Sequence, residues 1–551
     1  MEFYNKIDVY ILNLLPNELW AIVLSYLPRI SRQSLSKLHG FKELIDNVTH
    51  LEEKKLYNAL RTGQKLIWQK TRLTGVQMQS RLKHGAVTFN NEMFIFGGAS
   101  TNQTTSGNYN DLWIYNNYDK FKRMVFCSSI FPSPKSNFGM TNEGRKIFIV
   151  GGKGSVGNAI EQPYSNLFNA FEIHSLDVKN GIWHKTMTTG NENEPRVSNG
   201  IRCIMLSNLE LIAVAGLVPT FHNWDAMNAE ENVHYRASLQ VSLLKFTDET
   251  LEKGQWYNLA DIQQTHRRGF PMPRTESHLV KLGNDCIFMF GGRAINSSCQ
   301  DGWIMKITRN PYSLKWYQVN VDNLLVPPLP THIFPSCVVQ DILVFTGVRT
   351  SVMKKPENEK PRNSNNESQR SPAQQQQQPS PSSSSSSNSP SIRQQPAEMR
   401  RIFINSERPL STIGAMVAFT VPVPAPVVPQ KVLKIQVSNE PSPSPPPQLA
   451  KAVRTRDYPM RVYCLDLKNI MNCTDEMLRE KLSVRWLTLK NNGLYNGAPE
   501  LRAYSTFNRL DNGITMIGGV KRNQAAEEDD SLFTQATNEV FILTYSNDNE
   551  T

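Results

Sequence analysis

The stretch Met93-Phe94-Ile95-Phe96-Gly97-Gly98 decides the fold, because it is a short apolar run that ends in two small residues. Similar runs recur at 147–152, 211–216, 287–292, 342–347 and 514–519. A strand with a diglycine that returns every roughly 50–75 residues is typical of a radially repeated β-fold. The glycines supply close backbone approach or positive φ, and no phosphate-loop Lys-Ser/Thr follows them.

Each copy lies among further strand-like segments. A polar turn with a basic residue precedes it, a third apolar strand follows, and a fourth strand carries an aromatic residue. The aromatic residues are Phe121, Trp183, Trp256, Trp316 and Trp486. Four segments per unit with period-two alternation predict units of four strands.

The fifth unit is interrupted by a long insertion. Its second strand ends at Gly347, whereas its third begins only at Arg461. The interval 350–457 is rich in Ser, Pro and Gln, and we expect it to be disordered because it cannot bury enough apolar surface to offset its ordering entropy. Such an insertion is tolerated, since each doubling of a loop costs only about 0.6 kcal/mol.

The last unit lacks a fourth strand. The segment 538–543 is followed by only a short tail, while 66–70, which contains Trp68, is a spare strand before the first unit. Pairing these two segments would remove two exposed edges. The sequence therefore predicts a mainly β fold, a six-bladed propeller closed by the strand around Trp68.

An all-helical segment precedes the strands. In the stretch 10–28 (YILNLLPNELWAIVLSYLP), Pro16 suits the first turn of a helix, and Leu19, Ile22, Val23 and Tyr26 fall on one face. Further helices are expected at about 31–46 and 48–64. A unit of about 50 residues cannot bury all its apolar faces alone, so some should meet a partner or the next domain.

Two parts of the sequence resemble known families. The string around Leu15-Pro16, Glu18-Leu19 and Ile22 resembles an F-box, and the repeated units resemble kelch repeats. Similarity to the F-box/kelch-repeat family implies a small N-terminal all-α F-box domain, which binds Skp1-type adaptors of cullin–RING ubiquitin ligases, and a kelch β-propeller. The adaptor contacts that the resemblance implies are Leu15, Pro16, Leu19, Ile22, Val23 and Leu27.

The resemblance has one departure in the second half of the F-box. That half usually carries a Cys or Ser and then a Trp, where this chain has Leu38-His39-Gly40-Phe41. The alternative is a helical cap that packs on the propeller without an adaptor. The expected domains are an F-box at 8–60, a first propeller part at 64–349, the insertion at 350–457 and a second propeller part at 458–546.

Function follows from the resemblance as an expectation. It implies a substrate-recognition subunit of an SCF-type (Skp1–cullin–F-box) E3 ubiquitin ligase, in which the F-box docks on Skp1 and the propeller binds the protein to be ubiquitinated. The alternative is a kelch scaffold or adaptor protein of the cytoskeleton or of signalling, with no ligase role. The helix after Pro16 discriminates between them, because only the first needs an adaptor.

Target contacts are expected on one rim of the propeller. Arg81, Lys135, Arg196 and Arg274 open successive units and would form a basic crescent for an acidic or phosphorylated segment. The alternative is that these residues brace the loops between blades. Phe221 and Trp224, in the long segment 217–237, are candidate anchors because binding concentrates on loops of rigid scaffolds.

Several function classes find no support in the sequence. The net charge of +11 comes without a basic stripe interleaved with aromatics, so we expect no nucleic-acid partner. Histidines and cysteines lack metal-binding spacing and no nucleophile motif occurs, so we expect no catalytic residues, metal or cofactor. Seven scattered cysteines indicate a reducing compartment. With no expected signal peptide or membrane span, we expect a cytoplasmic or nuclear protein.

Overall fold

The computed structural model describes residues 15–26, 35, 41–100, 107–116, 120–126, 130–154, 172–190, 193, 195, 199–221, 233–260, 269–294, 297–322, 331–348, 459–511, 513–522 and 533–546. These residues all belong to one unit of the chain, Met1–Pro356 with Arg454–Thr551. The insertion expected at 350–457 lies outside the described residues.

Two α-helices precede the strands. Helix α2 spans Asn17–Tyr26, directly after Pro16 as the sequence predicts, and α4 spans Phe41–Thr62. The predicted break between 46 and 48 is wrong, because α4 continues through it: the segment 42–62 contains no glycine or proline that would interrupt a helix. The helix ends at Gly63, whose φ of 63° lies in the left-handed region that terminates helices.

The main strands form antiparallel groups of four. In chain order these are β2 Gly85–Phe89, β3 Glu92–Phe96, β4 Leu112–Asn116 and β5 Lys120–Arg123; β7 Gly139–Glu143, β8 Lys146–Val150, β10 Ile173–Asp177 and β11 Ile182–Lys185; β13 Arg202–Ser207, β14 Glu210–Phe221, β15 Val233–Phe246 and β16 Lys253–Ala260; β17 His278–Lys281, β18 Cys286–Phe290, β19 Gly302–Thr308 and β20 Ser313–Asp322; β21 Ser336–Val339, β22 Ile342–Gly347, β23 Arg461–Asp466 and β24 Ser483–Trp486; and β26 Thr506–Leu510, β27 Gly513–Ile517, β30 Val540–Tyr545 and β1 Leu66–Lys70.

Shorter elements connect these groups. They are β6 Lys135–Ser136, β9 Lys153–Gly154, β12 Met187–Thr189, β25 Arg502–Ala503, β28 Val520–Arg522, β29 Phe533–Ala536, and the 3-10 turns η3 Met477–Arg479 and η4 Lys490–Gly493. Two parallel pairings, β12 with β16 and β20 with β24, join neighbouring groups at their outer strands. The split fifth unit is confirmed, because β22 pairs with β23 across the insertion.

The first strand of each group contacts the first strand of the next. These contacts join β2 to β7, β7 to β13, β13 to β17, β21 to β26, and β26 back to β2. The remaining step, from β17 to β21, is made by a hydrogen bond of 2.7 Å between Ser336 Oγ and His278 Nδ1. The innermost strands therefore form a closed circle.

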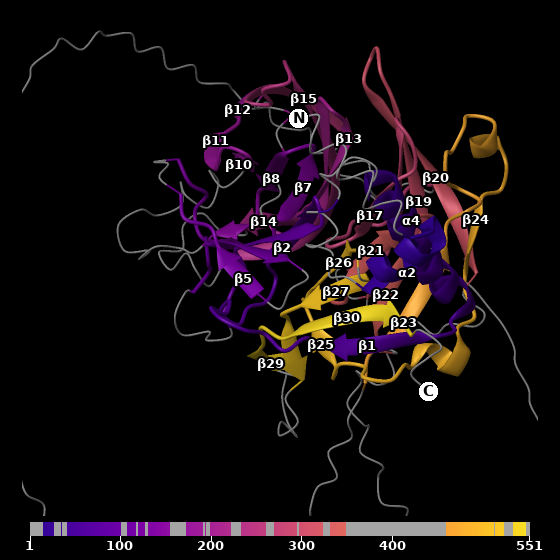
Figure 1. Cartoon of the computed structure of the whole chain (residues 1–551). Helices are drawn as coiled ribbons and strands as arrows, with labels where there is room; N and C mark the ends of the chain where they lie inside the picture. The colour runs from indigo at the N-terminus through magenta and orange to yellow at the C-terminus, as the bar shows by residue number, and fades with distance from the viewer. Residues whose placement is uncertain are drawn as a thin grey trace, which may run out of the picture. The chain divides into compact units, whose positions relative to one another are not determined.

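The N-terminal strand completes the last group. Strand β1 pairs antiparallel with β30, from Leu66 opposite Tyr545 to Lys70 opposite Phe541. Figure 1 shows β1, at the N-terminal end of the colour scale, beside β30 at its C-terminal end. The predicted closure is confirmed.

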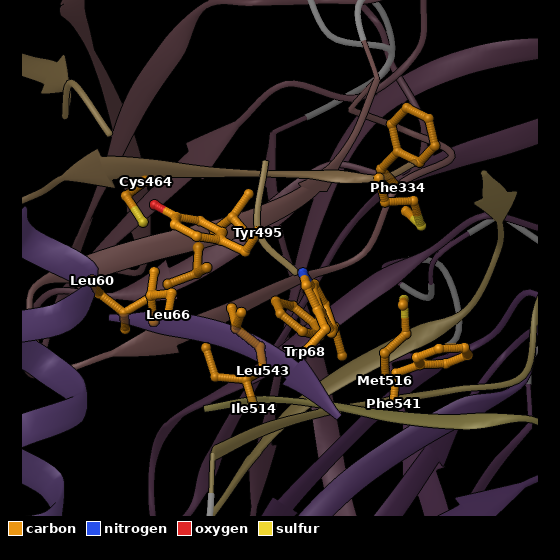
Figure 2. Packing of buried hydrophobic residues seen from close by; sticks show 14 of the residues in the cluster. Leu60, Leu66, Trp68, Phe334, Cys464, Tyr495, Ile514, Met516, Phe541 and Leu543 are labelled. Carbon is orange, nitrogen blue, oxygen red and sulfur yellow. The ribbon is translucent and has the colours of Figure 1, made fainter. Parts of the chain in front are cut away.

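Aromatic side chains of the fourth strands fill the spaces between neighbouring groups. Trp183 of the second group lies 5.7 Å from Phe96 of the first, and Trp486 of the fifth lies 5.8 Å from Phe290 of the fourth. Figure 2 shows the largest apolar cluster, in which Leu60 of α4 packs with Leu66 and the closing strands. The helix thus shares a core with the strands.

Candidate functional site

Helix α2 presents an apolar face to solvent. Leu19 and Val23 are one turn apart, on the same side of the helix, and expose 46% and 39% of their surface. On another side Leu24 is fully buried, and Trp20 makes an edge-to-face contact with Phe41 of α4 at 5.1 Å. Among the described residues, the core between α2 and α4 therefore forms without these two aliphatic side chains.

The other expected adaptor contacts are only partly visible. Leu15 is partly buried and Pro16 is exposed at the start of α2. The side chain of Ile22 and the whole of Leu27 lie outside the described residues. Leu24, which the sequence-based set omits, is fully buried in the cluster with Phe41, to which Trp20 also belongs.

Arg81, expected on an accessible rim, is instead fully buried. Its guanidinium donates to both carboxylate oxygens of Asp111, at 2.7 and 3.0 Å, and to the carbonyl of Gly97 at 2.9 Å. Trp113 Nε1 donates to the same carboxylate. Although burial acts to raise the pKa of Asp111, the hydrogen bonds from Arg81 and Trp113 lower it overall.

Arg274 repeats this geometry in the fourth group. It is fully buried, donates to Asp301 at 2.7 and 2.8 Å, and donates to the carbonyl of Gly291 at 3.1 Å. Trp303 Nε1 again donates to the carboxylate. The described part of the chain thus shows a brace in which a basic residue ties the diglycine to the third strand.

The expected basic crescent is corrected by these placements. Lys135 is also buried, with 3% exposure, and burial is the main cause that lowers its pKa. Arg502, which the sequence-based set omits, is buried and donates to Glu539 at 3.0 Å, so it holds the equivalent place in the last group. Side chains enclosed in this way cannot meet a protein target without leaving the core.

Backbone hydrogen bonds fix the register between groups. The amides involved are those of Gly200 and of the residues two positions after Arg81, Lys135, Arg274 and Arg502. Each donates to the carbonyl of the equivalent residue in a neighbouring group: Tyr504 to Ile333, Lys83 to Tyr504, Asn137 to Lys83, Gly200 to Asn137 and Glu276 to Gly200. Counting back two from Gly200 gives Ser198, so Arg196 is not the equivalent of Arg81. Arg196 itself lies outside the described residues.

Four of these residues, Lys83, Asn137, Ile333 and Tyr504, line a cavity of about 230 Å³. Residues of the innermost strands and the turns before them line it, including Lys83, Arg202 and Tyr504. The Lys83 ammonium lies 4.5 Å from the centre of the Tyr504 ring, a cation–π contact. The cavity therefore carries positive charge at its wall.

Three histidines also line the cavity. Burial is the main cause that lowers the pKa of His84 to about 3, and the pKa values of His278 and His332 to about 4. All three are neutral at pH 7. They can accept and donate hydrogen bonds there but add no charge.

The remaining candidates are less defined. Phe221 ends β14, opposite Val233 of β15, and its side chain is not described; Trp224 lies outside the described residues. Within the described ranges, no cluster of three or more His, Cys, Asp or Glu residues suits a metal ion. No described helix is long and apolar enough to cross a membrane.

Comparison with known proteins adds a family for part of the chain. Residues 51–216 match the family model described as the KLHDC2/KLHL20/DRC7 Kelch-repeats domain. The match runs from the middle of α4 into β14. No curated protein matches the chain significantly.

Proposed function

From the Kelch-repeat domain that this chain contains, we propose a substrate-recognition subunit of an SCF-type (Skp1–cullin–F-box) ubiquitin ligase. A Kelch-repeat domain suggests a module for protein interaction or substrate binding. In this proposal the N-terminal helices act as an F-box that docks on a Skp1-type adaptor. The Kelch-repeat domain holds the protein to be ubiquitinated, and the partner enzymes supply the chemistry.

The observation that carries the proposal is the exposed face of α2. Leu19 and Val23 leave aliphatic surface in water, although Leu24, Trp20 and Phe41 show that the same helices have a packed core. Burying an aliphatic side chain contributes roughly 1.5–3 kcal/mol. A partner that covers both residues would therefore gain affinity without disturbing the fold.

We assign the four-stranded groups to the blades of a six-bladed propeller. The closed circle of first strands and the pairing of β1 with β30 support this count. The brace that Arg81 and Arg274 form in the first and fourth groups also supports it, because equivalent contacts in separate groups indicate a radial repeat. A closed set of blades gives a rigid carrier for target-binding loops.

Helix α4 supports a fixed spacing between the two proposed binding parts. Its first half packs with α2 through Phe41, whereas Leu60 lies in the core shared with the strands. Near its end, Arg61 donates to Asp341 at 2.8 Å and to Asp466 at 3.2 Å. Helix α4, about 33 Å long, thus connects α2, which carries the proposed adaptor-binding residues, to the Kelch-repeat domain.

Proximity labelling in cells tests the proposal against a kelch scaffold with no ligase role. The wild-type chain and the Leu19→Asp/Val23→Asp variant should label the same targets, because both substitutions are on α2. Blocking the proteasome should raise target levels in cells with the wild-type chain and have a smaller effect with the variant. Targets that respond equally to both proteins would favour the scaffold.

A further inference from the structure

The cavity at the centre of the innermost strands carries cations without matching carboxylates. Lys83 and Arg202 line it, and no ion pair joins either of them to a carboxylate among the described residues. The hydrogen bond recorded for the Arg202 guanidinium goes to the carbonyl of its neighbour Ile201, at 3.1 Å. Both residues are half-buried, and their partial removal from water is the main cause that lowers the pKa of both cations.

Charge around the cavity is not balanced. Arg293 is exposed close by, where its charge lowers the pKa of Lys83. The carboxylate that acts on this group is Glu276, which accepts a hydrogen bond of 2.7 Å from Asn137 Nδ2. One carboxylate therefore faces four cations: Lys83, Arg202, Arg293 and Lys153, whose charge also lowers the pKa of Lys83. Like charges that are held together and partly removed from water are costly unless something opposite in sign joins them.

A polar atom in the same wall also lacks a partner. Ser505 Oγ makes no hydrogen bond within the described residues, and the residue is 8% exposed. Ser505 lines the cavity. A buried polar group without a partner costs about 1–3 kcal/mol, which a ligand with oxygen atoms would recover.

We propose that this cavity is a binding site for a small oxyanion, a phosphate or carboxylate group, held by Lys83 and Arg202. The guanidinium fork suits both groups, and the ligand supplies the missing negative charge. The volume of about 230 Å³ is below the range of drug-sized sites and admits one such group. The inference rests on the Kelch-repeat domain and not on adaptor binding, which involves a different surface.

Calorimetric titration of the full chain tests the site with four probes: inorganic phosphate, pyrophosphate, succinate and O-phosphoserine. We expect saturable binding of at least one probe, weakened at least tenfold by Arg202→Met and by Lys83→Asn. Asparagine is chosen at 83 because it tolerates the φ of 54° found there. Lys179→Met, at an exposed turn, is the matched control and should bind as wild type.

The probes also separate the sources of the anion. Tighter binding of O-phosphoserine than of phosphate indicates a group carried on a larger molecule, and the reverse indicates a free anion; both support the site. A preference for succinate assigns a carboxylate. Absence of binding by all four probes at millimolar concentration overturns the proposal, as does equal affinity of the control and both cavity variants. Melting temperatures show that each variant is folded.

Discussion

Trp68 lies opposite Leu543 in the antiparallel pairing of β1 with β30. The indole is 4% exposed and lies 6.1 Å from the ring of Phe507 in the same group. Strand β1, the N-terminal strand of the Kelch-repeat domain, therefore completes the sheet formed by the C-terminal strands. The two ends of this domain stabilise one another. Cutting this pairing would leave β30 with an open edge.

Trp68→Ala should destabilise the protein by about 3–5 kcal/mol, because it leaves a large cavity in the shared core. Urea denaturation measures the change, monitored by far-UV circular dichroism instead of tryptophan fluorescence because the substitution removes a tryptophan. Val76→Ala, at a residue that is 69% exposed, is the control and should cost less than about 0.5 kcal/mol. Equal midpoints for the two variants would mean that the closing strand contributes little.

Arg81→Met should destabilise the protein by about 3–5 kcal/mol, because it leaves the Asp111 carboxylate buried without its partner. The double variant Arg81→Met/Asp111→Leu should recover part of this loss, since both charges are then removed. Arg123→Met, at an exposed residue, is the control. A destabilised single variant that the second substitution does not rescue would argue against the brace.

Comparing Gly63→Ala with Gly144→Ala separates the cost of backbone strain from the cost of a steric clash between the new Cβ and neighbouring atoms. Both glycines have positive φ, 63° and 52°, so the strain of a side chain is similar. A Cβ at Gly63 would lie 2.6 Å from the Lys490 amide nitrogen, whereas a Cβ at Gly144 meets nothing within 4 Å. Gly63→Ala should therefore cost at least about 1 kcal/mol more than Gly144→Ala in chemical denaturation. Similar losses would show that α4 is not held tightly at its end.

Glu539 should make stability depend on pH. Burial acts to raise its pKa, but hydrogen bonds from Lys70 and Lys521 lower it to about 2, from 4.5. The folded pKa is the lower one, so this contribution is present above pH 4.5 and is lost as the pH falls toward 2. Since Lys70 is exposed, we expect about 1–2 kcal/mol.

Comparing wild type with Glu539→Gln at several pH values measures this contribution. The difference in free energy of unfolding should be largest at pH 7 and shrink by pH 3. Glu249→Gln, at an exposed residue, is the control. A difference that is constant across this range would show that the Glu539 charge is not the cause.

The sequence allowed the strand order to be predicted because the repeat contains its own signals. Each apolar run with a small terminal pair became a second strand, and the spare segment around Trp68 could pair with only one incomplete unit. The predicted helix boundary between 46 and 48 was wrong, and the exposed Asp46 and Asn47 lie there. Without a glycine or proline, they form the solvent face of one continuous helix.

The candidate site was harder to predict than the fold. Arg81 and Arg274 recur at equivalent positions, and recurrence is expected both of a binding surface and of a structural brace. The partners that distinguish them, Asp111 and Asp301, lie just before the third strand of each group, far along the sequence, so only the structure shows the pairing. Arg202 was missed because it begins an innermost strand and no local motif marks it; its significance comes from neighbours in other groups.

Direct binding of the purified full chain to a Skp1-type adaptor tests the proposed function most directly. Wild type should bind, and Leu19→Asp/Val23→Asp should bind at least roughly a hundredfold more weakly, because two exposed aliphatic side chains lose their burial. Val76→Asp, at an exposed valine outside α2, should bind as wild type. Failure of the wild-type chain to bind, or unchanged affinity of the α2 variant, would contradict the proposed ligase role.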